Sequence, residues 1–322
     1  MIKGGDDFPR HENKYGVQMF FPKEIVVKPD TSTSIVVDWK NLKKLEETPP
    51  EKEDLNIVYK SSTYTDGDLK GQKLDLHMNI MYHPSSKEPS GLLILIPGGG
   101  FISCEIHKKL LALRQNLHQN CNLAVAIFEY HVVGNGFYYD ALDDIKDAIE
   151  FLKKNEKKYN FDANKLIILG NSAGGYFTAL YTIKNPEGIK CAVDLYGLSD
   201  LTKIGSDYDE ECFKKHLTKN SSESMYIFGC KSGKGVGDDE KEAQKANPVT
   251  YITGKEPPFL FMHGDCDRCV SNSQTLLVHN KLLEKGGKST RYVLKGDDHG
   301  KGGFETEECY KVILEFIKNN LK

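Results

Sequence analysis

The stretch Leu166-Ile-Ile-Leu-Gly-Asn-Ser-Ala-Gly-Gly175 decides the fold of this chain. Its four apolar residues form a short unbroken run, which is typical of a central parallel strand covered on both faces. Gly170 to Gly174 then fits G-x-S-x-G, in which a serine occupies a sharp turn between a strand and a helix. We expect Ser172 to be an exposed nucleophile, with the N–H groups of the following helix directed at it.

Composition places the chain among folded globular proteins without a special class of partner. It has 322 residues, of which 39% are hydrophobic, and a net charge of −3. This charge gives no reason to expect nucleic acid or an anionic membrane as a partner. Apolar runs such as Leu92 to Ile96 are far too short to span a bilayer. Because no apolar signal segment follows Met1, we expect a cytoplasmic protein, or a secreted one if a leader was removed.

The eight cysteines do not form a recognisable metal or redox motif. Cys266-Asp-Arg-Cys269 has C-x-x-C spacing, but no second such pair and no nearby histidine pair accompanies it. The sequence therefore lacks the ligands that a zinc site needs. The Cys266–Cys269 pair also does not lie at the start of a helix, where redox-active C-x-x-C motifs lie. We expect no metal and no cofactor, with the cysteines free and a local disulfide as the alternative.

Buried strands alternate with helices through most of the chain. This order predicts an α/β protein with a mostly parallel sheet and helices on both faces. The expected strands are 55–60, 73–82, 92–96, 123–128, 166–169, 191–196, 259–262 and 291–294, and the expected helices are about 105–119, 140–157, 274–285 and 306–321.

Two segments fall outside this alternation. Residues 1–50 are predicted to be an N-terminal extension that packs on the core, either shaping a pocket or serving as a peripheral arm. Residues 51–322 form the main domain, and the polar, glycine-rich segment at about 198–257 interrupts it. We interpret this segment as a cap or lid, with a plain surface insertion as the alternative.

A nucleophilic serine needs a base, an acid that orients the base, and donors for the oxyanion. His299 is the best candidate for the base, because it follows the last strand in a glycine-flanked turn, and His131 is its competitor. Candidates for the acid, Asp265 and Asp267, precede His299 in the order typical of such sites. Asp297 and Asp298 are less favoured, since they adjoin the histidine and are expected to shape its turn.

Backbone donors for an oxyanion are expected from two places. Gly98-Gly-Gly100 follows a buried strand and carries no side chains that would block its N–H groups. The residue after the nucleophile, Ala173, supplies a further N–H.

Together these motifs resemble the esterase/lipase branch of the α/β-hydrolase superfamily, which includes hormone-sensitive-lipase-like carboxylesterases and microbial acetyl and feruloyl esterases. The resemblance covers about residue 72 to the C-terminus. The matching motifs are Pro97-Gly-Gly-Gly-Phe101, Phe161-Asp-Ala-Asn-Lys165, Gly170-Asn-Ser-Ala-Gly174, Asn247-Pro-Val-Thr-Tyr251, Pro257-Pro-Phe-Leu-Phe-Met-His-Gly264 and Gly296-Asp-Asp-His-Gly300.

The resemblance implies an α/β-hydrolase fold and a serine carboxylesterase that acts on small-molecule esters with short to medium acyl chains. The substrates that it suggests are acetyl or feruloyl esters of plant carbohydrates. It assigns the acid to Asp267 and the oxyanion hole to Gly99, Gly100 and Ala173. The chain departs from many relatives in having Pro97 where they carry a loop-orienting histidine. The alternatives are a serine peptidase of the prolyl-oligopeptidase type and a non-catalytic binding protein with this fold.

Overall fold

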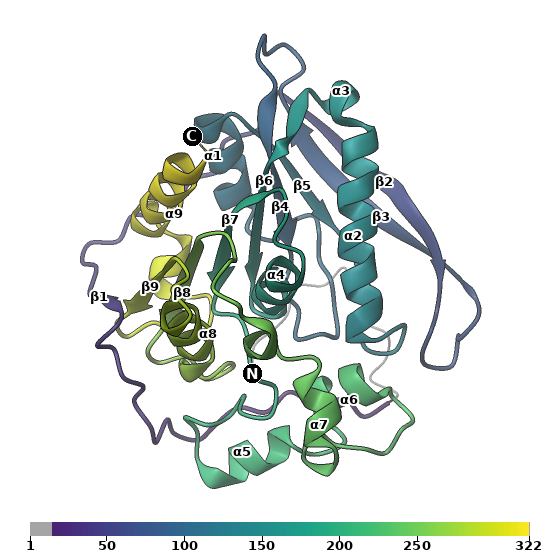
Figure 1. The fold of residues 1–322 in the computed structure, drawn as a ribbon, viewed down its shortest axis with the longest axis vertical. Coiled ribbons are helices and arrows are strands. Elements are labelled where there is room, and N and C mark those ends of the chain that lie inside the picture. The colour runs from purple at the N-terminus through teal and green to yellow at the C-terminus, as the bar shows by residue number, and fades with distance from the viewer. Residues whose placement is uncertain (1–14, 322) are drawn as a thin grey trace.

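The computed structural model describes residues 15–321, and nine strands in this part of the chain form one sheet (Figure 1). The strand order is β1-β9-β8-β7-β6-β4-β5-β3-β2. The strands are β1 Ile35–Val37, β2 Lys52–Thr63, β3 Lys73–Tyr82, β4 Ser90–Ile96, β5 Leu123–Phe128, β6 Phe161–Asn171, β7 Ile189–Leu195, β8 Phe259–Gly264 and β9 Ser289–Leu294. Every neighbouring pair is parallel except β2 with β3 and β3 with β5, so the prediction of a mostly parallel sheet is confirmed.

Helices cover both faces of this sheet. The helices of residues 15–321 are α1 Leu111–Cys121, α2 Tyr138–Lys154, α3 Glu156–Tyr159, α4 Ala173–Lys184, α5 Glu210–His216, α6 Ser222–Phe228, α7 Glu240–Gln244, α8 Ser273–Glu284 and α9 Glu307–Asn320. Alternate residues of β8 point to opposite sides. Phe261 packs in the cluster that contains α4 and α8 residues, whereas Met262 contacts Cys309 of α9.

The expected helix at 105–119 is wrong at its start, because α1 begins only at Leu111. The Glu105 carboxylate accepts hydrogen bonds from the backbone N–H groups of His107 and Lys108 and closes a separate turn. Leu110 has a φ of 48°, a left-handed conformation that a helix cannot continue through. The helical periodicity of the leucines therefore extends further than the helix itself.

The segment at about 198–257 lies between β7 and β8 and holds α5, α6 and α7, which gather at one end of the molecule (Figure 1). The N-terminal arm, residues 15–27, runs along it. Gln18 donates its N–H to the Asn220 carbonyl, and Val26 donates its N–H to the Asp207 carbonyl. Further along, β1 joins the sheet edge by pairing with β9. The remainder of the 1–50 segment, residues 1–14, lies outside the described residues.

Parallel strands bring their carboxyl ends to the same edge of the sheet, where α/β proteins form their sites. Ile96, the last residue of β4, pairs with Gly170 near the end of β6. Gly264 and Leu294, the last residues of β8 and β9, also pair with each other. The predicted site residues follow these four strands, in loops or, for Ala173, at the start of α4. No helix within residues 15–321 has the length and apolar character needed to cross a membrane.

Candidate active site

Ser172 lies at the turn between β6 and α4, as the G-x-S-x-G pattern predicts. Its φ of 55° and ψ of −124° are strained for a residue with a side chain, and the residue is 8% exposed. The flanking glycines allow the turn. A Cβ atom on Gly174 would overlap the carbonyl oxygen of Ile96 in β4, and one on Gly170 would overlap the carbonyl of Gly174. The elbow therefore packs too closely against its surroundings for larger residues at these two positions.

We expect Gly174→Ala to lower the free energy of unfolding by about 1–3 kcal/mol, because the new methyl group overpacks the contact with β4. Urea unfolding measures the change. Gly237→Ala is the matched control, since a Cβ at Gly237 meets its nearest neighbour at an ordinary 3.4 Å. Equal stability of the two variants would contradict the close approach of the elbow to β4.

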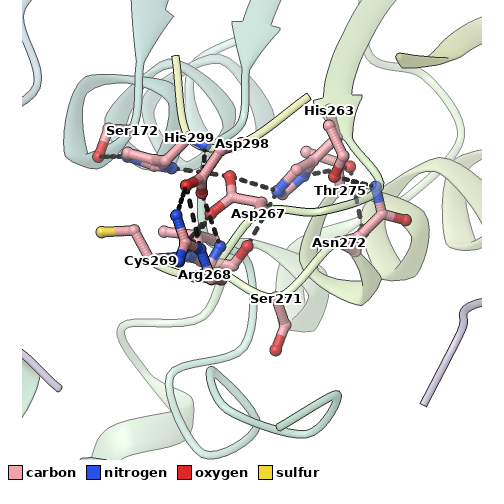
Figure 2. A network of polar contacts seen from close by, with 12 residues as sticks. Ser172, His263, Asp267, Arg268, Cys269, Ser271, Asn272, Thr275, Asp298 and His299 are labelled. Atoms are coloured by element: carbon pink, nitrogen blue, oxygen red, sulfur yellow. Dashed lines mark hydrogen bonds and ion pairs between the residues drawn. The ribbon is translucent and has the colours of Figure 1, made fainter. Parts of the chain in front are cut away.

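His299 lies in the loop after β9 and reaches Ser172 directly. Its Nε2 is 2.9 Å from the Ser172 Oγ, and its Nδ1 is 2.8 Å from Oδ2 of Asp267. Figure 2 shows Ser172, His299 and Asp267 in one row, joined by hydrogen bonds, with His263 beyond them. With Nδ1 donating to the carboxylate, Nε2 is free to accept the serine proton.

Asp267 is buried and is held by several donors. Its Oδ1 accepts the N–H groups of Cys269 at 2.8 Å and Val270 at 2.9 Å. Its Oδ2 lies 3.1 Å from Nε2 of His263, besides the contact with His299. Burial alone would raise the pKa of this carboxyl, but the two histidines outweigh burial and hold it well below its usual range. These contacts therefore favour the ionised form of the Asp267 carboxyl.

Hydrogen bonds in the structure distinguish the other residues that the sequence offered as the acid or the base. Asp265 accepts the N–H of Gly296 and ties the two loops together without contacting His299. Asp297 accepts the N–H of Gly303, while Asp298 binds Arg268 and the N–H of His299, as expected of residues that shape the turn. The competing base, His131, is buried and bonds Asp144 at 2.6 Å.

The Gly98–Gly100 loop packs against the elbow. The N–H of Gly98 donates to Oδ1 of Asn171 at 3.1 Å, and a Cβ on Gly98 would approach Ser172 Cβ to 2.9 Å. Within residues 15–321, the N–H groups of Gly99, Gly100 and Ala173 donate no hydrogen bond. Ala173 is the first residue of α4, whose opening N–H groups have no partner inside the helix. Gly99 and Gly100 line the same pocket as Ser172, and Ala173 follows Ser172 in the chain.

Sequence reasoning missed three residues that shape this site. His263, on β8, bonds Thr275 Oγ1 at 2.9 Å through Nδ1 and supports Asp267 through Nε2. It belongs to the quoted His-Gly motif, which was a signal for it. Tyr196 packs edge-on against the His299 ring at 4.7 Å between centroids. Cys269 lines the pocket beside Ser172 and His299; all eight cysteines, this one included, are free.

A pocket of about 1110 Å³ opens over Ser172 and His299. The glycine loop and the His299 loop form parts of its wall, and the N-terminal arm adds Met19, Phe21 and Pro22. The arm thus shapes the pocket, one of the two roles considered for it. Four cationic side chains, Lys108, Lys109, Arg268 and Lys301, also line the pocket, together with Glu105, Asp298 and Glu305.

Comparison with known proteins identifies the family. The model of the BD-FAE family matches residues 78–282, well over half of the chain. The chain belongs to the BD-FAE family. This match includes Ser172 and Asp267, whereas His299 and the N-terminal arm lie outside it. Esterase relatives and structural neighbours place this BD-FAE member in the esterase branch of the α/β-hydrolase superfamily, which confirms the predicted resemblance.

Individual relatives of this BD-FAE member agree with that placement. The chain is 34% identical over 216 residues to endo-1,4-beta-xylanase B of Butyrivibrio fibrisolvens, covering 65% of the chain and 32% of the relative. It is 24% identical to esterase LipC of Mycobacterium tuberculosis, covering 66% of the chain and 53% of LipC. The chain therefore spans about a third and about a half of the length of these two curated relatives.

Among solved structures, a truncated form of a carbohydrate esterase from gut microbiota superposes with a TM-score of 0.70 at 19% identity. The match covers 87% of this chain and 99% of that one. At this identity the likeness establishes the fold, and it confirms the predicted α/β-hydrolase architecture for the BD-FAE member described here.

Proposed function

We propose that this chain is a serine carboxylesterase that hydrolyses short- to medium-chain acyl esters through Ser172, His299 and Asp267. The observation that carries the proposal is the unbroken line of hydrogen bonds from the Ser172 hydroxyl through His299 to the buried carboxyl group of Asp267. Membership of an esterase family supports the same reaction class. No step of this chemistry requires a metal or cofactor.

In the first half of the reaction, Ser172 Oγ attacks the ester carbonyl while His299 Nε2 takes its proton. Asp267 keeps the proton of His299 on Nδ1 and stabilises the imidazolium that forms. The oxyanion accepts hydrogen bonds from the N–H groups of Gly99, Gly100 and Ala173. The tetrahedral intermediate then collapses, and His299 gives its proton to the leaving alcohol.

In the second half, a water molecule attacks the acyl-enzyme. His299 takes a proton from this water, and a second tetrahedral intermediate forms in the same oxyanion site. Its collapse returns the proton to Ser172 and releases the carboxylic acid. One histidine therefore serves both halves, provided that it is neutral when each begins.

The substrates we propose are acetyl or feruloyl esters of plant carbohydrates. A xylanase-named relative and a carbohydrate-esterase neighbour support a carbohydrate alcohol. The pocket of about 1110 Å³ offers room for a sugar-sized leaving group beside His299.

Initial rates on p-nitrophenyl acetate, butyrate and octanoate, on methyl ferulate and on a peptide anilide test this function. Hydrolysis of an ester that is lost on Ser172→Ala, with no cleavage of the anilide, is the expected result. Cleavage of the anilide in preference to every ester would favour a prolyl-oligopeptidase-type peptidase instead. No Ser172-dependent turnover of any compound would favour a binding protein.

The rate should fall with decreasing pH as the imidazole of His299 becomes protonated. Burial lowers the pKa of His299, but the Cys269 sulfur and the Asp267 carboxylate outweigh burial and hold it well above its usual value of about 6.5. Only the neutral imidazole accepts the serine proton, so kcat/KM should drop as pH falls through this raised pKa. A pH profile of p-nitrophenyl acetate hydrolysis measures it, and a flat profile down to pH 5 would contradict a histidine base.

A further inference from the structure

A second, much smaller hollow lies beside Ser172. Its volume is about 20 Å³, and it shares Met19, Gly100, Ser172 and Cys269 with the large pocket. The difference that matters is His299, which lines the large pocket but not the small one. The remaining walls of the small pocket are Phe20, Phe101, Leu198, Ile204, His216, Ser222, Glu223 and Val270.

The proton path determines which part of an ester enters each pocket. The leaving oxygen must reach Nε2 of His299 to receive its proton, so the alcohol lies in the pocket that His299 lines. The carbonyl oxygen points to the N–H groups of Gly99, Gly100 and Ala173. The remaining substituent of the carbonyl carbon is the acyl chain, and the small pocket is the space left for it.

The small pocket fits a very short acyl chain. A cavity of this volume holds little more than one water-sized group. A methyl group is of that size, whereas each further methylene group needs one of the walls to move. The pocket therefore matches the methyl group of an acetyl ester better than a longer alkyl chain or a ferulate ring.

The wall formed by His216 and Glu223 resists such movement. Nδ1 of His216, at the end of α5, lies 2.7 Å from Oε1 of Glu223 in α6, and both side chains are almost fully buried. Burial lowers the pKa of His216, yet Glu223 outweighs burial and the pKa rises to about 10, so the two form an ion pair at neutral pH. Separating a buried ion pair is costly, and an alkyl chain offers no replacement for it.

Met19 lines both pockets. Its side chain lies over the glycine loop, so that a Cβ on Gly100 would come within 2.6 Å of the Met19 sulfur. The arm that carries it is fixed at Gln18, which exchanges backbone hydrogen bonds with Asn220 and Ser222 of the 198–257 segment. Met19 therefore borders both the acyl space and the open pocket, and Ser172 borders the same two spaces.

We propose that Met19 is a specificity-determining residue that restricts the acyl group to about the size of acetyl. This inference rests on the proposed esterase function and narrows its acyl range, favouring acetyl esters over feruloyl and medium-chain esters. It also assigns a role to the N-terminal arm, which lies outside the part of the chain that the family model matches.

The test compares Met19→Ala with wild type on p-nitrophenyl acetate, butyrate and hexanoate, whose leaving group is the same. For wild type we expect kcat/KM to fall roughly tenfold or more from acetate to butyrate, the usual penalty for methylene groups that do not fit. Removing the Met19 side chain joins the two spaces, so the butyrate-to-acetate ratio should rise roughly tenfold. Met19→Leu restores the bulk and should keep the wild-type ratio.

Phe21→Ala is the matched control, because Phe21 belongs to the same arm but lines only the large pocket. Its butyrate-to-acetate ratio should equal that of wild type. The inference is overturned if wild type hydrolyses butyrate as well as acetate, or if Met19→Ala leaves the ratio unchanged. Thermal melting of each variant verifies that the proteins compared are folded.

These outcomes separate the inference from the proposed function. Hydrolysis that depends on Ser172 but is indifferent to acyl length overturns the role of Met19 and leaves the esterase intact. Hydrolysis that Ser172→Ala does not reduce overturns the esterase proposal, and the acyl placement with it.

Discussion

Replacing Ser172 with alanine should lower kcat for p-nitrophenyl acetate by at least ~10⁴-fold while the protein remains folded. Only the hydroxyl group is lost, and among residues 15–321 its one hydrogen bond is to His299. Without it no acyl-enzyme forms, and the remaining groups only position water and substrate. The free energy of unfolding should change by no more than about 1 kcal/mol, since one modest hydrogen bond is removed.

The matched control is Ser206→Ala, an exposed serine that lines neither pocket. It should keep the wild-type rate. A folded Ser172→Ala protein with unchanged turnover would show that another residue is the nucleophile.

Asp267→Asn should lower kcat by ~10³ to 10⁴-fold. An asparagine preserves the shape, but its amide cannot stabilise the imidazolium and can present an N–H to Nδ1 of His299, which favours the wrong tautomer. Loss of the carboxylate also removes a charge that raises the pKa of His299, so the acidic limb of the pH profile should move to lower pH. A rate measurement and a pH profile together identify this role.

Asp265→Asn is the control for that substitution, because Asp265 lies in the same loop and contacts Gly296 rather than His299. We expect a rate within a few-fold of wild type and no shift of the acidic limb. If Asp265→Asn instead caused the larger loss, the acid would be assigned to the wrong residue of the loop.

Most strands and helices could be predicted, because the apolar pattern of each segment matches the element that the structure shows. The run Leu123 to Phe128 is predicted as a buried strand and is β5 with the same bounds. The helix expected from Thr306 to Leu321 agrees with α9, whose N-cap is Thr306. Such elements are recognisable because their apolar spacing is complete and their ends carry local signals. The start of α1 is the exception, since the Glu105 turn and the left-handed Leu110 override the leucine spacing.

The sequence was sufficient to predict which loops form the candidate site. Ser172 and His299 stand out from their motifs, and the structure places their side chains in contact. The choice between Asp265 and Asp267 needed the family resemblance, because two carboxylates two residues apart follow the same strand. The geometry that separates them is the turn in which Cys269 and Val270 direct their N–H groups at Asp267.

The pocket walls could not be predicted, because they come from segments without regular patterns. Met19 belongs to an arm with little secondary structure, and its position depends on pairing with Asn220, some 200 residues away. The His216–Glu223 pair likewise joins two short helices of the 198–257 segment, α5 and α6. Contacts of this kind leave no local signal in the chain.

The most direct test of the central claim is covalent labelling with an organophosphate ester such as paraoxon, read by peptide mass spectrometry. The account predicts one phosphoryl group per chain, on Ser172, with loss of esterase activity in proportion to labelling. Labelling should be absent in Ser172→Ala and much slower in Asp267→Asn. Full activity after labelling of Ser172, or inactivation with the label on another residue, would contradict the proposed nucleophile.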